Sequence, residues 1–148
     1  MTWNFQWLAD HPKNDIQRTA KDYQALKQIF LTHQPDVLAF QEVNSAKNLY
    51  RVLPKDQYQV FMSSRIMSEE DKFNGINQFT GFAVKTSISA KQLNDISDLS
   101  SPAASLGLTS HYQQKVRYGA VISIKLDDNA ITIANLHLNL AVLSNLQQ

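Results

Sequence analysis

Two alternating segments joined by a turn limit the possible folds of this chain most. Residues 117–126 and 131–138 alternate between apolar and polar side chains, and the residues between them include Asp-Asp-Asn at 127–129. Alternation with a period of two is typical of a half-buried strand, and Asp and Asn favour tight turns. The sequence therefore predicts an antiparallel hairpin over residues 117–138.

The second strand of this hairpin ends in a histidine. With a period of two, Ile131, Ile133, Asn135 and His137 share one face of the strand. We expect the strand to begin in the core and to bring the imidazole of His137 to the rim of the sheet. A functional site would lie at that rim.

A second apolar run ends in a carboxylate. Residues 37–40 are Val-Leu-Ala-Phe, and Gln41 and Glu42 follow them. A short continuous apolar run is typical of a strand covered on both faces, and open α/β sheets place ligand-binding groups at the carboxyl ends of their strands. Glu42 is therefore either a ligand at such an end or a solvated loop carboxylate.

Helical and strand patterns fill much of the remaining sequence. Apolar residues recur at helical spacing over residues 15–32, where Asn14 and Gln17 would form a capping box, and Ser45 can cap a second, short helix. Residues 87–114 show no clear pattern, and we expect a loop there with at most one short helix. The further strands predicted from composition and alternation are Thr2–Leu8, Tyr58–Met62 and 81–85.

The composition allows one globular domain. Of the 148 residues, 43% are apolar and 18% are charged, which is typical of a single domain of mixed secondary structure. The net charge of +1 demands no polyanionic partner, so a polyanion would be held locally, by a few basic groups or by a metal. No apolar run approaches the roughly 20 residues of a membrane span. We expect an α/β (α+β) fold in a single domain spanning residues 1–148.

The sequence leaves the cellular compartment open. There is no cysteine, which excludes disulfides and thiolate ligands and fits reducing and oxidising compartments equally. The first predicted strand starts at the second residue, which suggests a mature chain from which an export signal has been removed. This suggestion is compatible with a secreted or periplasmic location but does not assign one.

Four polar side chains are candidates for chemistry. Glu42 offers the hard oxygen ligand that suits Mg²⁺, which takes only one or two protein carboxylates and keeps water or phosphate in its other positions. His137 either stabilises a phosphate and protonates a leaving oxygen or has a structural role. Asn135 either orients His137 or satisfies backbone groups. Arg117 either pairs with a phosphate in bidentate fashion or caps the sheet.

Five short motifs, taken in their order, resemble the endonuclease/exonuclease/phosphatase superfamily. They are Thr-Trp-Asn at 2–4, Pro-Asp-Val-Leu-Ala-Phe-Gln-Glu at 35–42, Gly-Phe-Ala-Val at 81–84, Arg-Tyr-Gly-Ala-Val at 117–121 and Asn-Leu-His-Leu at 135–138. The set is most similar to the secreted or periplasmic endonuclease-like branch, whose mature chains open with a Trp-Asn-x-x-Trp-Leu pattern. The resemblance covers residues 2–139.

The resemblance implies a fold and a set of roles. The fold is a deoxyribonuclease-I-like two-sheet sandwich with flanking helices. Glu42 matches the metal-binding glutamate, Asn4 the asparagine beside it and His137 the catalytic histidine. Arg117 matches a basic residue near the substrate backbone and would act in catalysis with Asn4 and His137. Arg117 and Asn135 would contact the substrate.

The implied activity is metal-dependent hydrolysis of a phosphodiester, by an endonuclease acting on nucleic acid. Mg²⁺ would be the cofactor, with Mn²⁺ and Ca²⁺ as alternatives. Other members of the superfamily cleave phosphoinositides and sphingomyelin, and the sequence does not select among these substrates.

Two motifs of the superfamily, Gly-Asp-x-Asn and Ser-Asp-His, are absent from the sequence. The resemblance therefore covers about the N-terminal half of the family domain, and we expect a truncated sandwich whose activity is weak or lost. Half a sandwich leaves one inner sheet face uncovered. The alternative function is an inactive fragment or interaction module that forms a homo-oligomer through this face, with the side chains of Trp3, Phe5, Trp7, Ile131 and Ile133.

Overall fold

The structure is a computed structural model that describes residues 1–9, 16–64, 78–96 and 119–137. In this part of the chain, two sheets are formed, one with strand order β1-β2-β4-β3 and one with order β5-β6-β7. Neither of the two helices in the described ranges has the length and apolar content of a membrane span. In chain order the elements are β1 (Thr2–Leu8), α1 (Ala20–His33), β2 (Val37–Val43), α2 (Ala46–Leu49), β3 (Tyr58–Met62), β4 (Phe79–Lys85), β5 (Ala90–Gln92), β6 (Ala120–Leu126) and β7 (Asn129–Asn135).

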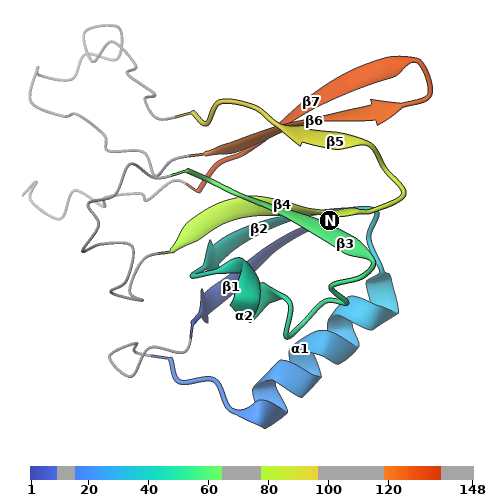
Figure 1. The fold of residues 1–148 in the computed structure, drawn as a ribbon. Helices are drawn as coiled ribbons and strands as arrows, with labels where there is room; N and C mark the ends of the chain where they lie inside the picture. The colour runs from blue at the N-terminus through green and yellow to red at the C-terminus, as the bar shows by residue number, and fades with distance from the viewer. Residues whose placement is uncertain (10–15, 65–77, 97–118, 138–148) are drawn as a thin grey trace, which may run out of the picture.

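The elements form three layers. Figure 1 shows α1 and α2 on one face of the four-stranded sheet and the three-stranded sheet on its other face. β1 and β2 are parallel, whereas the other neighbouring strands are antiparallel. The fold is therefore mixed α/β with two sheets, as the sequence predicted.

The four-stranded sheet separates two apolar cores because its side chains alternate between its faces. We call the core under the helices the helix-side core, and its largest fully buried side chains are Tyr58, Phe5, Phe30, Phe40, Leu8 and Leu38. We call the core between the two sheets the inter-sheet core, and its buried members are Phe82, Val84, Ala120, Ile122 and Ile124.

Most predicted strands are confirmed. β1 and β3 have the predicted bounds, β2 extends one residue beyond the strand expected over 37–42, and β4 begins two residues earlier than predicted. The antiparallel hairpin is β6–β7, with paired residues from Ala120↔Asn135 to Leu126↔Asn129 and Asp127 in a left-handed conformation (φ 53°) in its turn. The outer parts of the predicted hairpin, residues 117–118 and 138, lie outside the described residues.

The predicted start of the long helix is wrong. α1 begins at Ala20, where Thr19 and Asp22 form the capping box, and residues 10–15 lie outside the described part of the chain. The backbone N–H and hydroxyl of Thr19 both donate to the Asp22 carboxylate, at 2.7 and 2.8 Å, which lowers the pKa of Asp22. A Thr and an acidic residue three positions later therefore fix this helix start.

Two further expectations need correction. β5 lies in a segment where the sequence showed no pattern, and it is a strand because it pairs with β6 rather than because of its composition. β7 does not begin in the core, since Ile131 is 42% exposed and Asn135 is only 5% exposed. The predicted inner face of β7 is right, but burial increases along β7 toward Asn135, the end that leads to His137.

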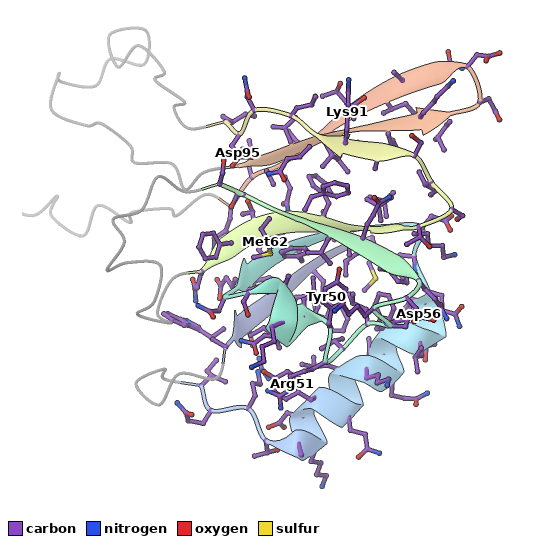
Figure 2. The ribbon with its side chains drawn as sticks, in the orientation of Figure 1. Tyr50, Arg51, Asp56, Met62, Lys91 and Asp95 are labelled. Carbon is purple, nitrogen blue, oxygen red and sulfur yellow. The ribbon has the colours of Figure 1, made fainter. Side chains whose placement is uncertain are left out.

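Side-chain hydrogen bonds join the two sheets along one edge. Asp95 accepts hydrogen bonds from the backbone N–H and the hydroxyl of Ser64, and the Gln92 amide donates to the carbonyl of Met62 at 2.6 Å. Figure 2 shows Met62 on β3 and Asp95 beyond β5, with β3 below β5. These bonds tie the end of β3 to β5 and the residues that follow it.

Gly81 supplies a test of how tightly the sheet packs. A Cβ at Gly81 would meet the Phe40 ring and the carbonyl oxygen of Phe61, and neither can move without disturbing the sheet. We expect Gly81→Ala to lower the free energy of unfolding by about 2–3 kcal/mol, as overpacking does. Urea denaturation followed by circular dichroism measures this loss.

Gly119→Ala is the matched control for this prediction. Its added methyl would first meet the end of the flexible Leu136 side chain, which can move aside. A loss of stability in Gly119→Ala as large as that in Gly81→Ala would contradict the role assigned to Phe40 and Phe61.

Candidate functional site

β1 and β2 both depart from regular pairing at the same level of the sheet. From Asn4 to Leu8, β1 advances four residues while its partner β2 advances two, from Gln41 to Val43. β2 in turn advances three residues, from Phe40 to Val43, while β4 advances two. Such bulges bend a strand and redirect its side chains, and they are frequent next to active sites.

Left-handed residues lie at both bulges. Gln6 and Trp7 have φ angles of 47° and 63° in β1, and Glu42 has a φ of 61° in β2. Because of the bulges, side chains three positions apart, Phe5 with Leu8 and Phe40 with Val43, enter the same helix-side core. Strict alternation, which we assumed for Thr2–Leu8, would have placed each pair on opposite faces.

Glu42 is the centre of the site. Its carboxylate is partly exposed, with 17% of the side chain accessible. The oxygen Oε1 accepts a hydrogen bond from the Asn4 amide at 3.1 Å and lies 3.1 Å from Nε2 of His137. The bulge in β2 turns this carboxylate toward the loop after β7, so residues 4, 42 and 137 meet at one end of the four-stranded sheet.

Both polar atoms of the Asn4 side-chain amide are hydrogen-bonded. Its Nδ2 donates to Glu42, and its Oδ1 accepts the backbone N–H of Gln6 at 2.8 Å. Arg18 supports the same turn, because its Nη2 donates to the carbonyls of Phe5 and Gln6 at 2.8 and 2.9 Å. Asn4 therefore fixes the orientation of the Glu42 carboxylate. Sequence reasoning missed Arg18, and no pattern in the sequence marks it.

Asn135 lies beneath the site, buried between the sheets. Its Nδ2 donates to the carbonyls of Phe40 and Gly81, and its Oδ1 accepts a hydrogen bond from Nε2 of Gln41. This placement favours the structural alternative of the sequence analysis, and contact with substrate stays a prediction. Gln41 was not predicted as part of the site, although a polar residue beside Glu42 at the end of a buried apolar run is a usable signal.

The structure thus brings three of the predicted site residues into contact. Asn4, Glu42 and His137 meet at one carboxylate oxygen, Asn135 lies below them, and Arg117 lies outside the described residues. Within the described ranges, no three His, Cys, Asp or Glu side chains gather as a group that could hold a metal ion. Among the residues described, Glu42 is the carboxylate at this site that could bind a metal ion.

The sequence matches one family profile over nearly its whole length. The profile described as the Endonuclease/Exonuclease/phosphatase family matches residues 1–141. No curated protein matches the chain.

Several solved structures share the fold at low sequence identity. TDP2 of D. rerio, complexed with a single-strand DNA product, has a TM-score of 0.58 and 18% identity over 98% of this chain. The human Nocturnin catalytic domain, with a bound sulfate anion, has a TM-score of 0.58 and 17% identity over 93%. An endonuclease/exonuclease/phosphatase from Bacteroides vulgatus has a TM-score of 0.57 and 16% identity over 92%. The chain spans 46%, 48% and 50% of the lengths of these three proteins.

The left-handed conformation of Glu42 has a measurable cost. A left-handed backbone costs a residue with a Cβ about 1–2 kcal/mol, and glycine avoids this cost. We therefore expect Glu42→Gly to be more stable than Glu42→Ala by about 1 kcal/mol in urea denaturation. At Gln59 in β3, which has no positive φ, the order should reverse. An alanine variant more stable than the glycine variant at position 42 would contradict the bulge geometry.

Proposed function

Because the chain belongs to the endonuclease/exonuclease/phosphatase family, we propose that it hydrolyses a phosphodiester, in nucleic acid, at the site formed by Asn4, Glu42 and His137. The observation that carries this proposal is that the side chains of Asn4 and His137 meet at one carboxylate oxygen of Glu42. They come from β1, the end of β2 and the segment after β7, so the fold rather than the local sequence brings them together.

The donor set fits a magnesium ion. Glu42 provides one partly exposed carboxylate, and its Oε2 accepts no hydrogen bond from the residues described. Mg²⁺ usually binds one or two carboxylates and keeps several waters, whereas an all-protein cage needs more ligands than the described residues provide here. Glu42 would therefore hold Mg²⁺, or Mn²⁺ or Ca²⁺ in its place. When bound, such an ion polarises a phosphoryl oxygen.

The side chains of the site have separate roles beside that of the metal ion. Asn4 holds the carboxylate of Glu42 in one orientation through its amide, which the backbone of Gln6 fixes in turn. His137, held 3.1 Å from Glu42, presents an imidazole that counters negative charge developing on the phosphate. Arg117 would pair with a substrate phosphate, for which its planar guanidinium is suited, and Asn135 would act near the substrate as well.

Nucleic acid is the substrate we favour. The D. rerio TDP2 structure holds a single-strand DNA product, and it matches 98% of this chain. The near-neutral net charge predicts that the protein contacts few phosphates of a nucleic acid. We therefore expect it to bind nucleic acid weakly and over a short stretch. Phosphoinositide and sphingomyelin head groups offer the same phosphodiester chemistry and are the competing substrates in any assay.

Hydrolysis should be slow but dependent on the site. The Gly-Asp-x-Asn and Ser-Asp-His motifs are absent from the sequence, and residues that act as a unit lose most of their effect when one of them is missing. With Mg²⁺ and a labelled single-stranded oligonucleotide, we expect feeble cleavage that EDTA abolishes. Because the set of residues is already incomplete, Glu42→Ala and His137→Ala should each lower the remaining rate by less than the roughly 10²-fold expected in a complete site.

Asp56→Ala is the matched control. Asp56 is an exposed carboxylate that precedes β3, at the end of the sheet opposite to Glu42 (Figure 2). Cleavage that falls equally in Asp56→Ala and Glu42→Ala would contradict the proposed site. Cleavage of a phosphoinositide or of sphingomyelin with no cleavage of DNA or RNA would contradict the nucleic-acid substrate.

Self-association is the second candidate function, and one observation favours it. The inner face of the β6–β7 hairpin leaves Leu126 and Ile131 exposed, at 43% and 42%, where the hairpin turns away from the four-stranded sheet (Figure 1). Phe5, in contrast, is buried in the helix-side core, and Trp3 stacks on it. Of the aromatic part of the surface predicted from the sequence, Phe5 is therefore covered, whereas Trp3 and Trp7 stay partly exposed, and Leu126 and Ile131 of the hairpin are the more exposed members.

We expect light scattering to detect a homo-oligomer that depends on this hairpin. Ile131→Lys should shift the protein to a monomer because it places a charge on the apolar patch. Thr132→Lys adds the same charge on the opposite face of β7 and should leave the association unchanged. A monomeric wild-type protein at concentrations of about 100 μM would exclude this candidate.

A further inference from the structure

Two buried amide side chains connect the strand of Glu42 to the strand that leads to His137. Asn135 is 5% exposed and Gln41 is 8% exposed. The two are joined by the hydrogen bond from Nε2 of Gln41 to Oδ1 of Asn135, at 2.7 Å, and the same Nε2 lies 3.1 Å from the hydroxyl of Thr2. The bond therefore crosses from the four-stranded sheet to the three-stranded sheet.

The side-chain amide of Asn135 donates to backbone carbonyls beside the bulge in β2. Regular pairing with β4 stops at Phe40↔Gly81 and resumes only at Val43↔Phe79. Asn135 donates to the carbonyls of Phe40 and Gly81 at 2.8 and 2.9 Å, so the other sheet supplies donors at the point where the ladder is interrupted. Without Asn135 the buried carbonyls of the last regular pair before the bulge would each lose a hydrogen-bond donor.

The two amide side chains belong to residues that lie close in sequence to Glu42 and His137. Gln41 immediately precedes Glu42, and Asn135, the last residue of β7, precedes His137 by two residues. We infer that the Gln41–Asn135 pair is a positioning device that keeps the β2 bulge in its shape and so sets the contact between Glu42 and His137. Its effect on metal binding rests on the proposed function, whereas its effect on the contact does not.

The contact between Glu42 and His137 can be followed by NMR without metal or substrate. The chain has four histidines, and the imidazole ¹H–¹³C resonance of His137 can be assigned by its loss in His137→Gln. Glu42→Gln removes the charge 3.1 Å from Nε2 and should move this resonance. Gln41→Leu and Asn135→Leu should move it in the same direction, because each lets Glu42 and His137 separate.

Gln59→Leu is the matched control for a purely structural effect. The Gln59 amide also donates to a backbone carbonyl, that of Ile88, at 2.9 Å, but it lies in β3 away from the bulge. We expect this variant to lose thermal stability as Gln41→Leu does and to leave the His137 resonance in place. If Asn135→Leu does not fold, Gln41→Leu alone decides the comparison.

Mg²⁺ binding, followed by calorimetry on the metal-free protein, gives the second readout. Groups that support a metal ligand typically change affinity by 10–100-fold, so we expect the dissociation constant to rise at least about tenfold in Gln41→Leu and Asn135→Leu but not in Gln59→Leu. No Mg²⁺ binding by the wild-type protein, together with the expected resonance changes, would overturn the proposed metal site and support the positioning pair. An unchanged His137 resonance in Gln41→Leu, or an equal change in Gln59→Leu, would overturn the positioning pair.

Discussion

The arrangement of the site depends on where β1 and β2 accept extra residues. Both strands run regularly up to Asn4 and Phe40, and both resume regular pairing at Leu8 and Val43. Between these points three residues adopt left-handed backbone conformations, which side chains with a Cβ normally avoid. The surrounding cores hold this strain in place, since Leu8 and Val43 are fully buried beyond the bulges. Without the bulge, Glu42 would follow the alternation of β2 and would not face the segment that carries His137.

The sequence predicted much of the fold because local chemistry and tertiary packing agree in most elements. The alternation of β6 and β7, the apolar run of β2 and the Ser45 cap of α2 were each visible and are each present. The predictions were wrong where local chemistry and tertiary packing disagree. The period of two in β1 is real up to Phe5, but the bulge interrupts it, and only the pairing with β2 determines where. β5 has no apolar pattern of its own and exists because β6 offers it a free edge.

The site was predictable to the extent that it consists of residues at strand ends. Asn4, Glu42 and His137 were chosen because of their motifs, and the topology places Asn4 and His137 each within hydrogen-bonding distance of Glu42. The supporting groups were harder to identify, for a physical reason. Gln41 and Arg18 act through backbone carbonyls and a neighbouring amide, and such partners are set by three-dimensional approach rather than by spacing along the chain. The exposed end of β7 illustrates the same limit, because alternation identifies the face of a strand but not how far the opposite sheet extends beneath it.

The side-chain bonds that join the two sheets are unevenly distributed, and this gives the molecule a gradient of local stability. The amides of Gln41 and Asn135, the Gln92–Met62 bond and the Ser64–Asp95 pair lie toward the end of the sheets where β2 and β3 end, whereas the Gln59–Ile88 bond lies nearer the start of β3. At the opposite end the hairpin tip carries exposed apolar side chains and few partners across the sheets. Local opening should therefore start at the tip, so backbone amides near Asp127 should exchange with deuterium early and those near Asn135 late. A thermal fluctuation of the hairpin would then leave the relative positions of Glu42 and His137 unchanged.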